Sequence, residues 1–413
     1  MRILVHDFVG HPFPVQLSRE LAIRGHHVTH TYLEGFQGPK GSLKKLTSEP
    51  QTLNIIPTRL PSTFQKYSPL RRLLAHRQYA RQIRKLIAQV NPDVVLSGQT
   101  PIDVQAELLW FCRRRGIGFV HWLQDVYFRA IEFFLRGKLG SLSFLASPIG
   151  FPFRQLEKSV AANSNRVIVI ADAFRDLLLS WSLPESQVNV IENWGVLDEM
   201  PEFPRSNSWS QEQGLGNETT FLYSGTLGIK HRPDLLYRLA AETRGNPRVV
   251  VVSEGVGRDF LEKQPRLNNL TLLDFQPFER LPEVLATADV LIATLESDAG
   301  QFAVPSKILN YLCAGRPILL AAPESNLASL TVKRSRAGYV VDPDNSDAWI
   351  SAAKKLAADK QCRDMLGISA RRYAQETFQI SKIAASFEEI LRSALQSKSV
   401  SSTSSVQTTP TRT

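Results

Sequence analysis

The stretch from Val290 to Pro323, VLIATLESDAGQFAVPSKILNYLCAGRPILLAAP, decides the fold of this chain. It reads as an apolar strand, an acid-bearing loop, a short helix that starts at Ser306, and a second apolar strand. Gly315 follows the apolar stripe of the helix, as is typical of a residue that ends a helix in the left-handed conformation. This order predicts a parallel sheet, with the start of the helix at the carboxyl end of a strand.

The start of that helix has the properties of an anion site. Free N–H groups and the positive end of the helix dipole favour a phosphate there, and we expect the hydroxyl of Ser306 to cap the first turn. Lys307 opposes the dipole from the first turn. Either an anion lies beside it, or its side chain faces solvent, and the sequence favours neither.

Outward from this stretch, the second half of the chain alternates regularly between strands and helices. Strands are predicted at 219–223, 248–252, 270–274, 289–294, 318–322 and 338–341, and helices at 234–243, 258–263, 281–286, 307–314, 346–358 and 360–377. The strands are apolar at nearly every position, which indicates a parallel sheet covered on both faces. Residues 218–378 therefore form a predicted Rossmann-like domain.

The first half opens in the same way. A strand is predicted at 3–9, a loop with Gly10 and His11, a helix at 15–24 and a strand at 27–32, followed by strands at 53–56, 94–97, 116–122, 166–170 and 189–191 and by helices at 70–90, 101–115 and 173–181. Residues 1–197 form a second predicted Rossmann-like domain. The dinucleotide fingerprint G-x-G-x-x-G is absent, which disfavours an NAD enzyme.

The predicted fold class is thus α/β, with two Rossmann-like domains whose parallel sheets face across a cleft. Residues 198–217 are rich in Pro, Ser and Gln and read as an interdomain linker. A last amphipathic helix is predicted at 379–396, and the Ser/Thr-rich residues 397–413 are predicted to be disordered.

Length and composition fit a two-domain protein in a reducing compartment. The chain has 413 residues, 43% of them hydrophobic, and its three cysteines lie outside any metal-ligand spacing. No apolar run is long enough to span a membrane, and the first residues read as a strand rather than a signal peptide. We therefore expect a cytoplasmic protein without structural disulfides or zinc.

The net charge of +10 is concentrated between residues 38 and 92. This segment contains eleven Lys and Arg residues and a single acidic residue, Glu49. No nucleic-acid-binding signature accompanies this charge, so nucleic acid is not an expected partner. An anionic membrane surface, or a phosphate-bearing lipid or sugar, is the better match.

Residues 127–160, YFRAIEFFLRGKLGSLSFLASPIGFPFRQLEKSV, intersperse Phe and Leu with basic residues. Such a composition is typical of a segment that lies in the membrane interface. The alternative is a helical hairpin that packs on its own domain, and the sequence alone separates the two only weakly.

Two further turns at the same sheet edge are compatible with phosphate binding. Gly225 and Gly228 leave room for backbone amides beside a phosphate, and Lys230 supplies a positive charge. Glu254 and Gly255 lie in a second tight turn after the next strand. A plain strand-to-helix turn explains each of these alone, but the three loops together indicate a phosphate-bearing ligand.

At this point the chain resembles a known family. The segments HPFPVQLSRELAIRGHHV, HWLQDVYF, RVIVIADAF, NVIENW, YSGTLGIKH and PSKILNYLCAGRPIL match, in order and up to about residue 395, the family 4-type glycosyltransferases of the GT-B fold. The enzymes of colanic-acid and exopolysaccharide synthesis are the most similar. The resemblance implies a nucleotide-diphosphate-sugar donor on the C-terminal domain, an acceptor on the N-terminal domain, and a last helix that crosses back to the N-terminal domain.

Carried over by position, the resemblance assigns several residues. The donor side comprises Gly225, Thr226, Gly228, Lys230, Glu254, Gly255, Phe275, Gln276, Ser306, Lys307 and Asn310. The acceptor side comprises Gly10, His11, Gln124 and Asp125. His11 and Asp125 also have simpler interpretations, as a loop-packing residue and a helix cap.

One departure from the family signature concerns its two glutamates, which contact the sugar and the ribose. Phe302 and Asn310 occupy those positions here. Asn310 keeps a hydrogen-bonding group for the ribose, whereas Phe302 does not replace a carboxylate. Glu296 or Asp298, earlier in the same loop, is the candidate for the sugar contact.

The chemistry requires stabilisation of the departing diphosphate, which Lys230, Lys307 and the loop amides are placed to provide. We therefore expect no metal and no cofactor beyond the donor itself, and the resemblance implies retention of anomeric configuration. For an inverting reaction, His11 or Asp125 would be the general base.

The predicted function is a cytoplasmic glycosyltransferase, peripheral to the inner face of the membrane, that extends a lipid-linked or polysaccharide acceptor in cell-surface polysaccharide synthesis. Two other classes remain open. A GT-B sugar-nucleotide epimerase would use the same donor cleft, and a non-catalytic partner subunit would explain the loss of the glutamates.

Overall fold

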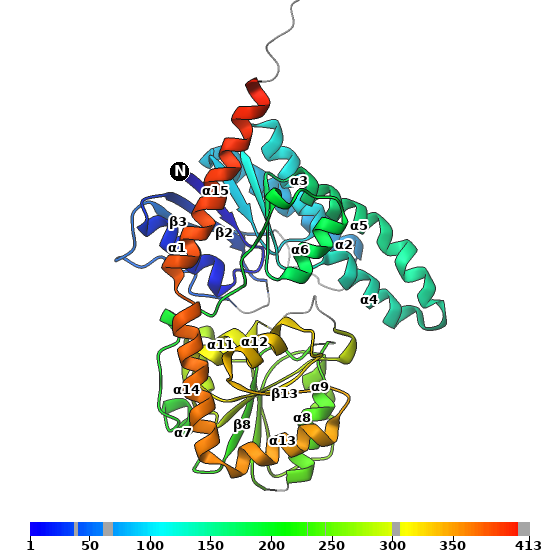
Figure 1. Cartoon of the computed structure of the whole chain (residues 1–413), viewed down its shortest axis with the longest axis vertical. Helices are drawn as coiled ribbons and strands as arrows, with labels where there is room; N and C mark the ends of the chain where they lie inside the picture. Colours follow the sequence, from blue (N-terminus) through cyan, green and yellow to red (C-terminus); the bar gives the residue numbers. More distant parts are fainter. Residues whose placement is uncertain (37–39, 61–68, 229, 244, 300–305, 404–413) are drawn as a thin grey trace, which may run out of the picture. The chain divides into compact units, whose positions relative to one another are not determined.

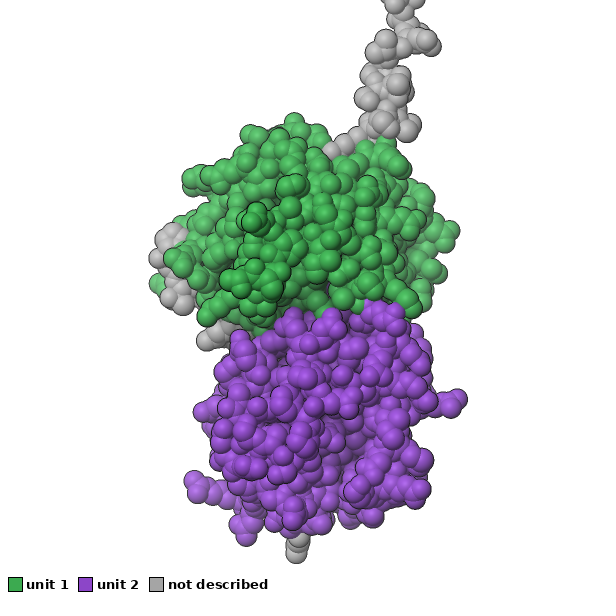
Figure 2. Space-filling view, turned by 90° about the vertical axis from the view of Figure 1, so that its left-hand side faces the viewer, with its two compact units in different colours: residues 1–192, 380–413 green, residues 193–379 purple. Residues whose placement is uncertain are grey.

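The computed structural model describes the chain except for residues 37–39, 61–68, 229, 244, 300–305 and 404–413. It divides into two compact units. Unit 1 contains Met1–Glu192 together with the C-terminal residues from Ile380, and unit 2 contains Asn193–Gln379. Figure 2 shows the two units in different colours.

Unit 1 is built on a seven-stranded parallel sheet in the order β3-β2-β1-β4-β5-β6-β7. Its strands are β1 (Arg2–His6), β2 (His27–Leu33), β3 (Leu53–Thr58), β4 (Val94–Ser97), β5 (Gly118–Leu123), β6 (Arg166–Val169) and β7 (Val188–Val190). The central strands β1, β4 and β5 are buried almost throughout, as their continuous apolar runs predict.

The helices of unit 1 are α1 (Pro12–Ile23), α2 (Pro69–Val90), α3 (Ile102–Arg114), α4 (Tyr127–Leu139), α5 (Ala146–Asn163), α6 (Asp172–Ser180) and α15 (Ile380–Thr403), with short 3₁₀ turns at Gly140–Leu145 and Glu185–Gln187. Figure 1 shows the last helix, α15, beside α1, at the start of the chain. Phe387 of α15 packs on Trp122 of β5, with ring centroids 4.8 Å apart. The end of the chain thus completes the core of unit 1.

Unit 2 has a six-stranded parallel sheet in the order β10-β9-β8-β11-β12-β13. Its strands are β8 (Thr220–Ser224), β9 (Arg248–Val252), β10 (Leu270–Leu273), β11 (Val290–Thr294), β12 (Ile318–Ala321) and β13 (Gly338–Val341). Its helices are α7 (Ser208–Glu212), α8 (Pro233–Thr243), α9 (Val256–Glu262), α10 (Leu281–Ala286), α11 (Lys307–Cys313), α12 (Leu327–Ser335), α13 (Ser346–Ala358) and α14 (Lys360–Thr377), and 3₁₀ turns lie at Leu197–Glu199, Phe278–Arg280 and Ser297–Ala299. The two parallel sheets confirm the predicted α/β fold class.

Several predicted boundaries shift, each for a local reason. Strand β1 ends at His6 rather than at residue 9, because the carboxylate of Asp7 accepts the N–H groups of Gly10 and His11 and turns the chain. Helix α1 begins at Pro12, three residues early, since proline is well suited to the first helical position. Helix α12 was not predicted at all.

Two predictions need correction: the linker at the start of unit 2 and the disordered tail that follows the last helix of unit 1. Residues 198–217 do not form a separate tether, because α7 lies within them and buries Trp209 in unit 2. Helix α15 continues to Thr403, so residues 397–403 are helical rather than disordered. Residues 404–413 lie outside the described part of the chain.

The segment 127–160 forms two packed helices, α4 and α5, joined by a 3₁₀ turn. Within the described residues, none of the helices combines the length and the apolar character that crossing a membrane requires.

Candidate functional site

The order of strands in unit 2 reverses between β8 and β11, and open α/β sheets bind their ligands at such a point, beyond the carboxyl ends of the strands. Two of the predicted donor loops meet there. The N–H of Glu296, after β11, donates to the carbonyl oxygen of Lys230, after β8, at 2.9 Å. The main chain therefore joins the glycine loop to the acid-bearing loop.

Lys307 turns back over this junction instead of facing solvent. Its Nζ lies 3.7 Å from the centroid of the Tyr223 ring and contacts the Tyr223 hydroxyl. Gly225 has φ +126°, a conformation that favours glycine, and a Cβ there would lie 3.3 Å from Nζ, so Lys307 packs directly over this glycine. Burial lowers the pKa of Lys307 to about 7. The solvent-facing interpretation is therefore wrong.

Tyr223 is a site residue that sequence reasoning missed. Its hydroxyl donates to the carbonyl oxygen of Thr226 at 2.9 Å while its ring carries the Lys307 ammonium. One side chain thus links the glycine loop to the first turn of α11. The only signal in the sequence was an aromatic residue at the end of an apolar strand, directly before a glycine turn.

The amides of both glycines in this loop are already used within the protein. The N–H of Gly225 donates to the carbonyl oxygen of Val252 at 3.0 Å, and the N–H of Gly228 donates to Nδ1 of His231 at 3.0 Å. Burial and the charges of Lys307 and Lys230 lower the pKa of His231 to about 3, so its ring is neutral and accepts this bond. A phosphate here would meet the lysine side chains unless the loop opened.

The start of α11 differs from the prediction. Ser306 occupies the N-cap position, but its side chain makes no capping hydrogen bond. Its backbone has φ −57° and ψ −21°, which is helical, whereas a capping residue adopts an extended conformation. Asn310 lies half-buried on the next turn of the same helix.

Glu296 is half-buried beside Arg232, with 3.9 Å between Oε2 and Nε. Burial raises its pKa, and this effect outweighs the opposing charge of Arg232. Asp298, two residues on, is exposed. Phe302 lies outside the described residues, so the structure places only one of the two signature positions, Asn310.

The remaining predicted donor residues follow β9 and β10. Gly255 packs closely on the glycine loop, since a Cβ there would lie 3.0 Å from the carbonyl oxygen of Leu227, and the carbonyl of Glu254 accepts the N–H of Leu227 at 2.9 Å. Phe275 is partly exposed. The side chain of Gln276 is engaged, because its Oε1 accepts from Trp209 Nε1 at 3.3 Å.

In unit 1 the strand order reverses between β1 and β4, and Gly10 and His11 follow β1 at that point. The buried carboxylate of Asp7 accepts the N–H groups of Gly10 and His11 at 2.8 Å and 2.5 Å, and lies 3.1 Å from Nδ1 of His11. A carboxylate only accepts, so Nδ1 carries the proton and Nε2 is left as the basic nitrogen. Asp7 lies within the strand predicted at 3–9, and no role at the site was predicted for it.

Burial raises the pKa of Asp7, but the charge and hydrogen bonds of His11 outweigh this, and the net pKa is lowered. Asp7 therefore remains a carboxylate and fixes the His11 ring. The ring also stacks on Phe13, with centroids 5.6 Å apart. The His11 ring is therefore held both by its hydrogen bond to Asp7 and by its packing on Phe13.

Gln124 and Asp125 follow β5, the next strand along this edge. Gln124 is buried, and exposed Asp125 accepts a hydrogen bond from Gln99, at the end of β4, at 2.6 Å. Asp125 is not the cap of α4. Glu157 of α5 takes that role, because its carboxylate accepts the N–H groups of Tyr127 and Phe128 at 2.9 Å and 3.1 Å. Burial raises the pKa of Glu157 to about 7.

Comparison with known proteins assigns most of the chain to two family models. The family model described as Glycosyltransferase Family 4 matches residues 14–196, and the model described as Glycosyl transferases group 1 matches residues 206–373. The chain is a GT-B glycosyltransferase. Its six-stranded unit carries the second of these matches, and with it the loops around Lys307.

Solved structures show that the glycosyltransferase shares its fold with others. Sucrose-phosphate synthase from Thermosynechococcus elongatus is 16% identical, with 96% of this chain and 100% of that chain covered and a TM-score of 0.72. HepE from Anabaena, solved with UDP, is 16% identical, with 95% and 100% covered and a TM-score of 0.67, and it has also been solved with UDP-glucose. No curated protein matches the sequence.

The described residues hold no group of three or more His, Cys, Asp and Glu side chains suited to a metal ion.

Proposed function

We propose that the glycosyltransferase takes its sugar from a nucleotide-diphosphate-sugar bound at the switch point of unit 2. The observation that carries this proposal is the partly buried Lys307, which lies over Tyr223 and Gly225 with no carboxylate paired to it among the residues described. A cation held in this way at the end of a parallel strand suits a diphosphate leaving group. The UDP and UDP-glucose complexes of HepE, a protein of the same fold, agree with this class of donor.

The acceptor, in this proposal, is a lipid-linked or polysaccharide glycan that meets the loop of Gly10 and His11 in unit 1. Reaction with retention needs no strong protein base, since the leaving phosphate takes the acceptor proton. His11, oriented by Asp7, then positions the reacting groups, and in an inverting reaction its Nε2 would be the base. The pathway of the enzyme, in this proposal, is exopolysaccharide synthesis of the colanic-acid type, which the resemblance of the sequence motifs supports.

The first test is binding of UDP, GDP, ADP and dTDP and their common sugar conjugates, measured by thermal shift. A ligand at 100 times its Kd stabilises the protein by about 2.7 kcal/mol, which corresponds to a shift of roughly 5 °C or more for a unit of this size. We expect one nucleotide family to give such a shift. Absence of a shift with every nucleotide would contradict the donor proposal and favour a non-catalytic subunit.

The surface of the α4–α5 hairpin supports a peripheral position on an anionic membrane. Phe144 and Phe151 are 68% and 54% exposed, and Arg129, Arg136 and Arg154 border the same hairpin. Exposed aromatic side chains flanked by arginines are typical of interfacial segments. On α2, exposed Arg77, Arg81 and Lys85 add further positive charge. We propose that this part of the chain holds the enzyme at the inner face of the membrane.

The double substitution Phe144→Ser and Phe151→Ser is expected to weaken binding to phosphatidylglycerol vesicles at least tenfold. Burying one such side chain contributes about 1.5–3 kcal/mol, and both sites are exposed, so the fold should tolerate the change. Sedimentation with vesicles measures the effect. Ile23→Ser is the matched control, because Ile23 is 66% exposed on α1, outside the hairpin. If the double variant binds the vesicles as tightly as the wild type, the proposed role of the hairpin in membrane binding is contradicted.

A further inference from the structure

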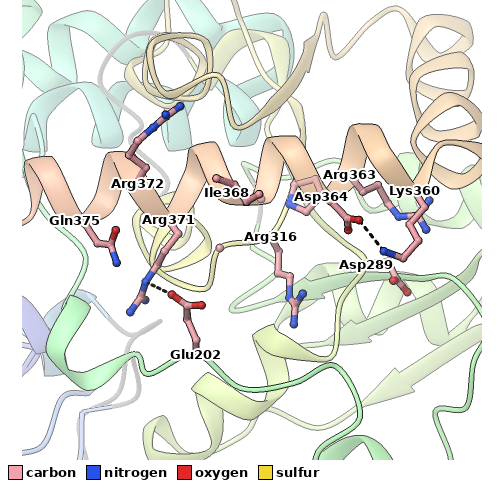
Figure 3. Close-up of a pocket in the computed structure, with 13 residues that line it drawn as sticks. Glu202, Asp289, Arg316, Lys360, Arg363, Asp364, Ile368, Arg371, Arg372 and Gln375 are labelled. Carbon is pink, nitrogen blue, oxygen red and sulfur yellow. Dashed lines mark hydrogen bonds and ion pairs between the residues drawn. The ribbon is translucent and has the colours of Figure 1, made fainter.

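A cavity lies in unit 2 at the edge of the sheet where β11 and β12 begin, opposite the donor loops. Figure 3 shows the residues that line it. Its volume is about 550 Å³, and it is bordered by α14 and by Gly315-Arg316-Pro317, the end of the motif that begins at Ser306. Asp289, also on its border, directly precedes β11, and Pro317 precedes β12. Because the strands are parallel, a strand of five residues separates the two edges by roughly 16 Å. A donor bound near Lys307 does not fill this cavity.

The charges that line the cavity do not balance. Each of its carboxylates is already paired: Glu202 with Arg371 at 2.9 Å, Asp289 with Arg205 at 2.8 Å, and Asp364 with Lys360 at 2.7 Å. Three further arginines of the lining, Arg316, Arg363 and Arg372, have no carboxylate partner in the described part of the chain. An excess of positive charge therefore remains on the wall of the cavity.

Arg316 is the most informative of these cations. It is half-buried, its Nη2 donates to the carbonyl oxygen of Phe203 at 3.2 Å, and its Nε is buried without a hydrogen-bond partner among the described residues. Burial lowers the pKa of Arg316, and this effect outweighs the charges of the nearby carboxylates, each of which is already paired with another cation. An additional anion beside this guanidinium would therefore be favourable. Figure 3 shows Arg316, Arg371 and Glu202 on one side of α14, with Arg372 extending to the other.

We propose that this cavity binds a phosphorylated small molecule, with Arg316 as its central ligand. The planar fork of a guanidinium matches the oxygens of a phosphate, and it does so better than a lysine can. The volume lies in the range of small-molecule sites and exceeds what an inorganic phosphate needs. This site is separate from the donor site and goes beyond the transfer reaction, although α11 connects the two, with Lys307 at one end and Gly315 just past the other.

The experiment is isothermal titration of the full chain with pyrophosphate, in a Lys307→Ala background that weakens the donor site. We expect saturable binding in this background and a loss of at least tenfold in affinity on adding Arg316→Gln. Arg316→Lys should recover part of the loss, because it restores the charge without the fork. Arg266→Gln is the matched control, since Arg266 is exposed outside the cavity and should leave binding unchanged.

A second variant acts in the opposite direction. Asp364→Asn removes an exposed carboxylate from the lining and frees Lys360, so pyrophosphate should bind two- to fivefold more tightly. The result with Asp364→Asn is independent of the stability of the Arg316→Gln variant. Circular dichroism checks that Arg316→Gln is folded. The proposal is overturned if Lys307→Ala alone abolishes binding, or if affinity is unchanged in both Arg316→Gln and Asp364→Asn.

The chemical source of the phosphate is separated by comparing inorganic phosphate, pyrophosphate and a hexose 1-phosphate in the same background. Tighter binding of the hexose phosphate, dependent on Arg316, supports recognition of a phosphorylated metabolite. Equal binding of all three, with no dependence on Arg316, would reduce the cavity to a general electrostatic effect and contradict the proposal.

Discussion

Lys307→Ala is expected to weaken binding of the donor nucleotide by roughly 12- to 150-fold. Loss of one charge-assisted hydrogen bond costs about 1.5–3 kcal/mol, and each 1.4 kcal/mol is a factor of ten in Kd. Lys307 is well placed for this role because Tyr223 and the glycine loop fix its ammonium at the strand ends. Calorimetry with the nucleotide identified by thermal shift measures the change.

The control is Lys333→Ala, which removes an exposed lysine on α12 that pairs with Glu324. Its nucleotide affinity should equal that of the wild type. Loss of binding in Lys307→Ala should not reflect unfolding, since burial of the ammonium disfavours its charged form. Unchanged affinity in Lys307→Ala would reject the role assigned to this residue.

The lowered pKa of Lys307 adds a pH dependence with a defined sign. In the free protein the pKa is about 7, so the side chain is charged below pH 7 and mostly neutral above it. A bound diphosphate favours the charged form and raises this pKa, so binding above pH 7 takes up a proton. Affinity for a nucleotide sugar, whose diphosphate does not titrate near neutrality, should therefore fall from pH 7 to 9. Lys307→Ala should remove this dependence.

Asp7→Ala is expected to lower the free energy of unfolding by about 2–5 kcal/mol, because it leaves the N–H groups of Gly10 and His11 without their acceptor. The folded-state pKa of Asp7 is lowered, so its stabilising effect is present above the unfolded-state pKa of about 3.9 and is lost as pH falls through the folded-state pKa. The difference from wild type should be constant from pH 8 to 5 and shrink below about pH 4. Urea unfolding across this range measures it.

Asp7→Asn tests the catalytic consequence with less damage to the fold. Because His11 positions the reacting groups in the proposed reaction, and a displacement of about 1 Å can cost about 10²-fold in rate, misorienting His11 should lower kcat at least tenfold. If Asp7 acts through His11, the double variant with His11→Ala should be no slower than His11→Ala alone. The control Asp176→Ala removes an exposed carboxylate of α6 and should leave both stability and kcat unchanged. Additive losses would mean that Asp7 does not act through His11.

The fold was largely predictable because its strands are continuous apolar runs. β8, β9, β11 and β12 bury every residue or nearly so, and such runs mark a parallel sheet whichever helices cover it. Helix α12 was missed because the side chains that it buries include Ser329, Thr331 and Ser335, so it lacks the apolar stripe that identifies a helix in the sequence. The extension of α15 to Thr403 runs through serines that composition alone assigns to a disordered tail.

The site was predictable only in part, for a different reason. Sequence motifs placed Gly225, Lys230 and Lys307 at one edge, and the bond between Glu296 and Lys230 brings their loops together. Tyr223 and His231 could not be inferred, because their roles depend on contacts across the sheet edge. The hydrogen bonds of the glycine-loop amides could not be inferred either. Glycine spacing indicates that an amide is accessible, but it does not identify the acceptor that the amide bonds to.

Helix α15 gives the chain an unusual order of assembly. Unit 1 is interrupted after Glu192 and regains its last helix only at Ile380. Glu388 of that helix pairs with Arg24 and His26, in the turn that follows α1. During synthesis the whole of unit 2 therefore leaves the ribosome before Trp122 of unit 1 receives its cover from Phe387. The domain that starts first finishes last, and a nascent chain arrested within unit 2 exposes an apolar surface that chaperones recognise.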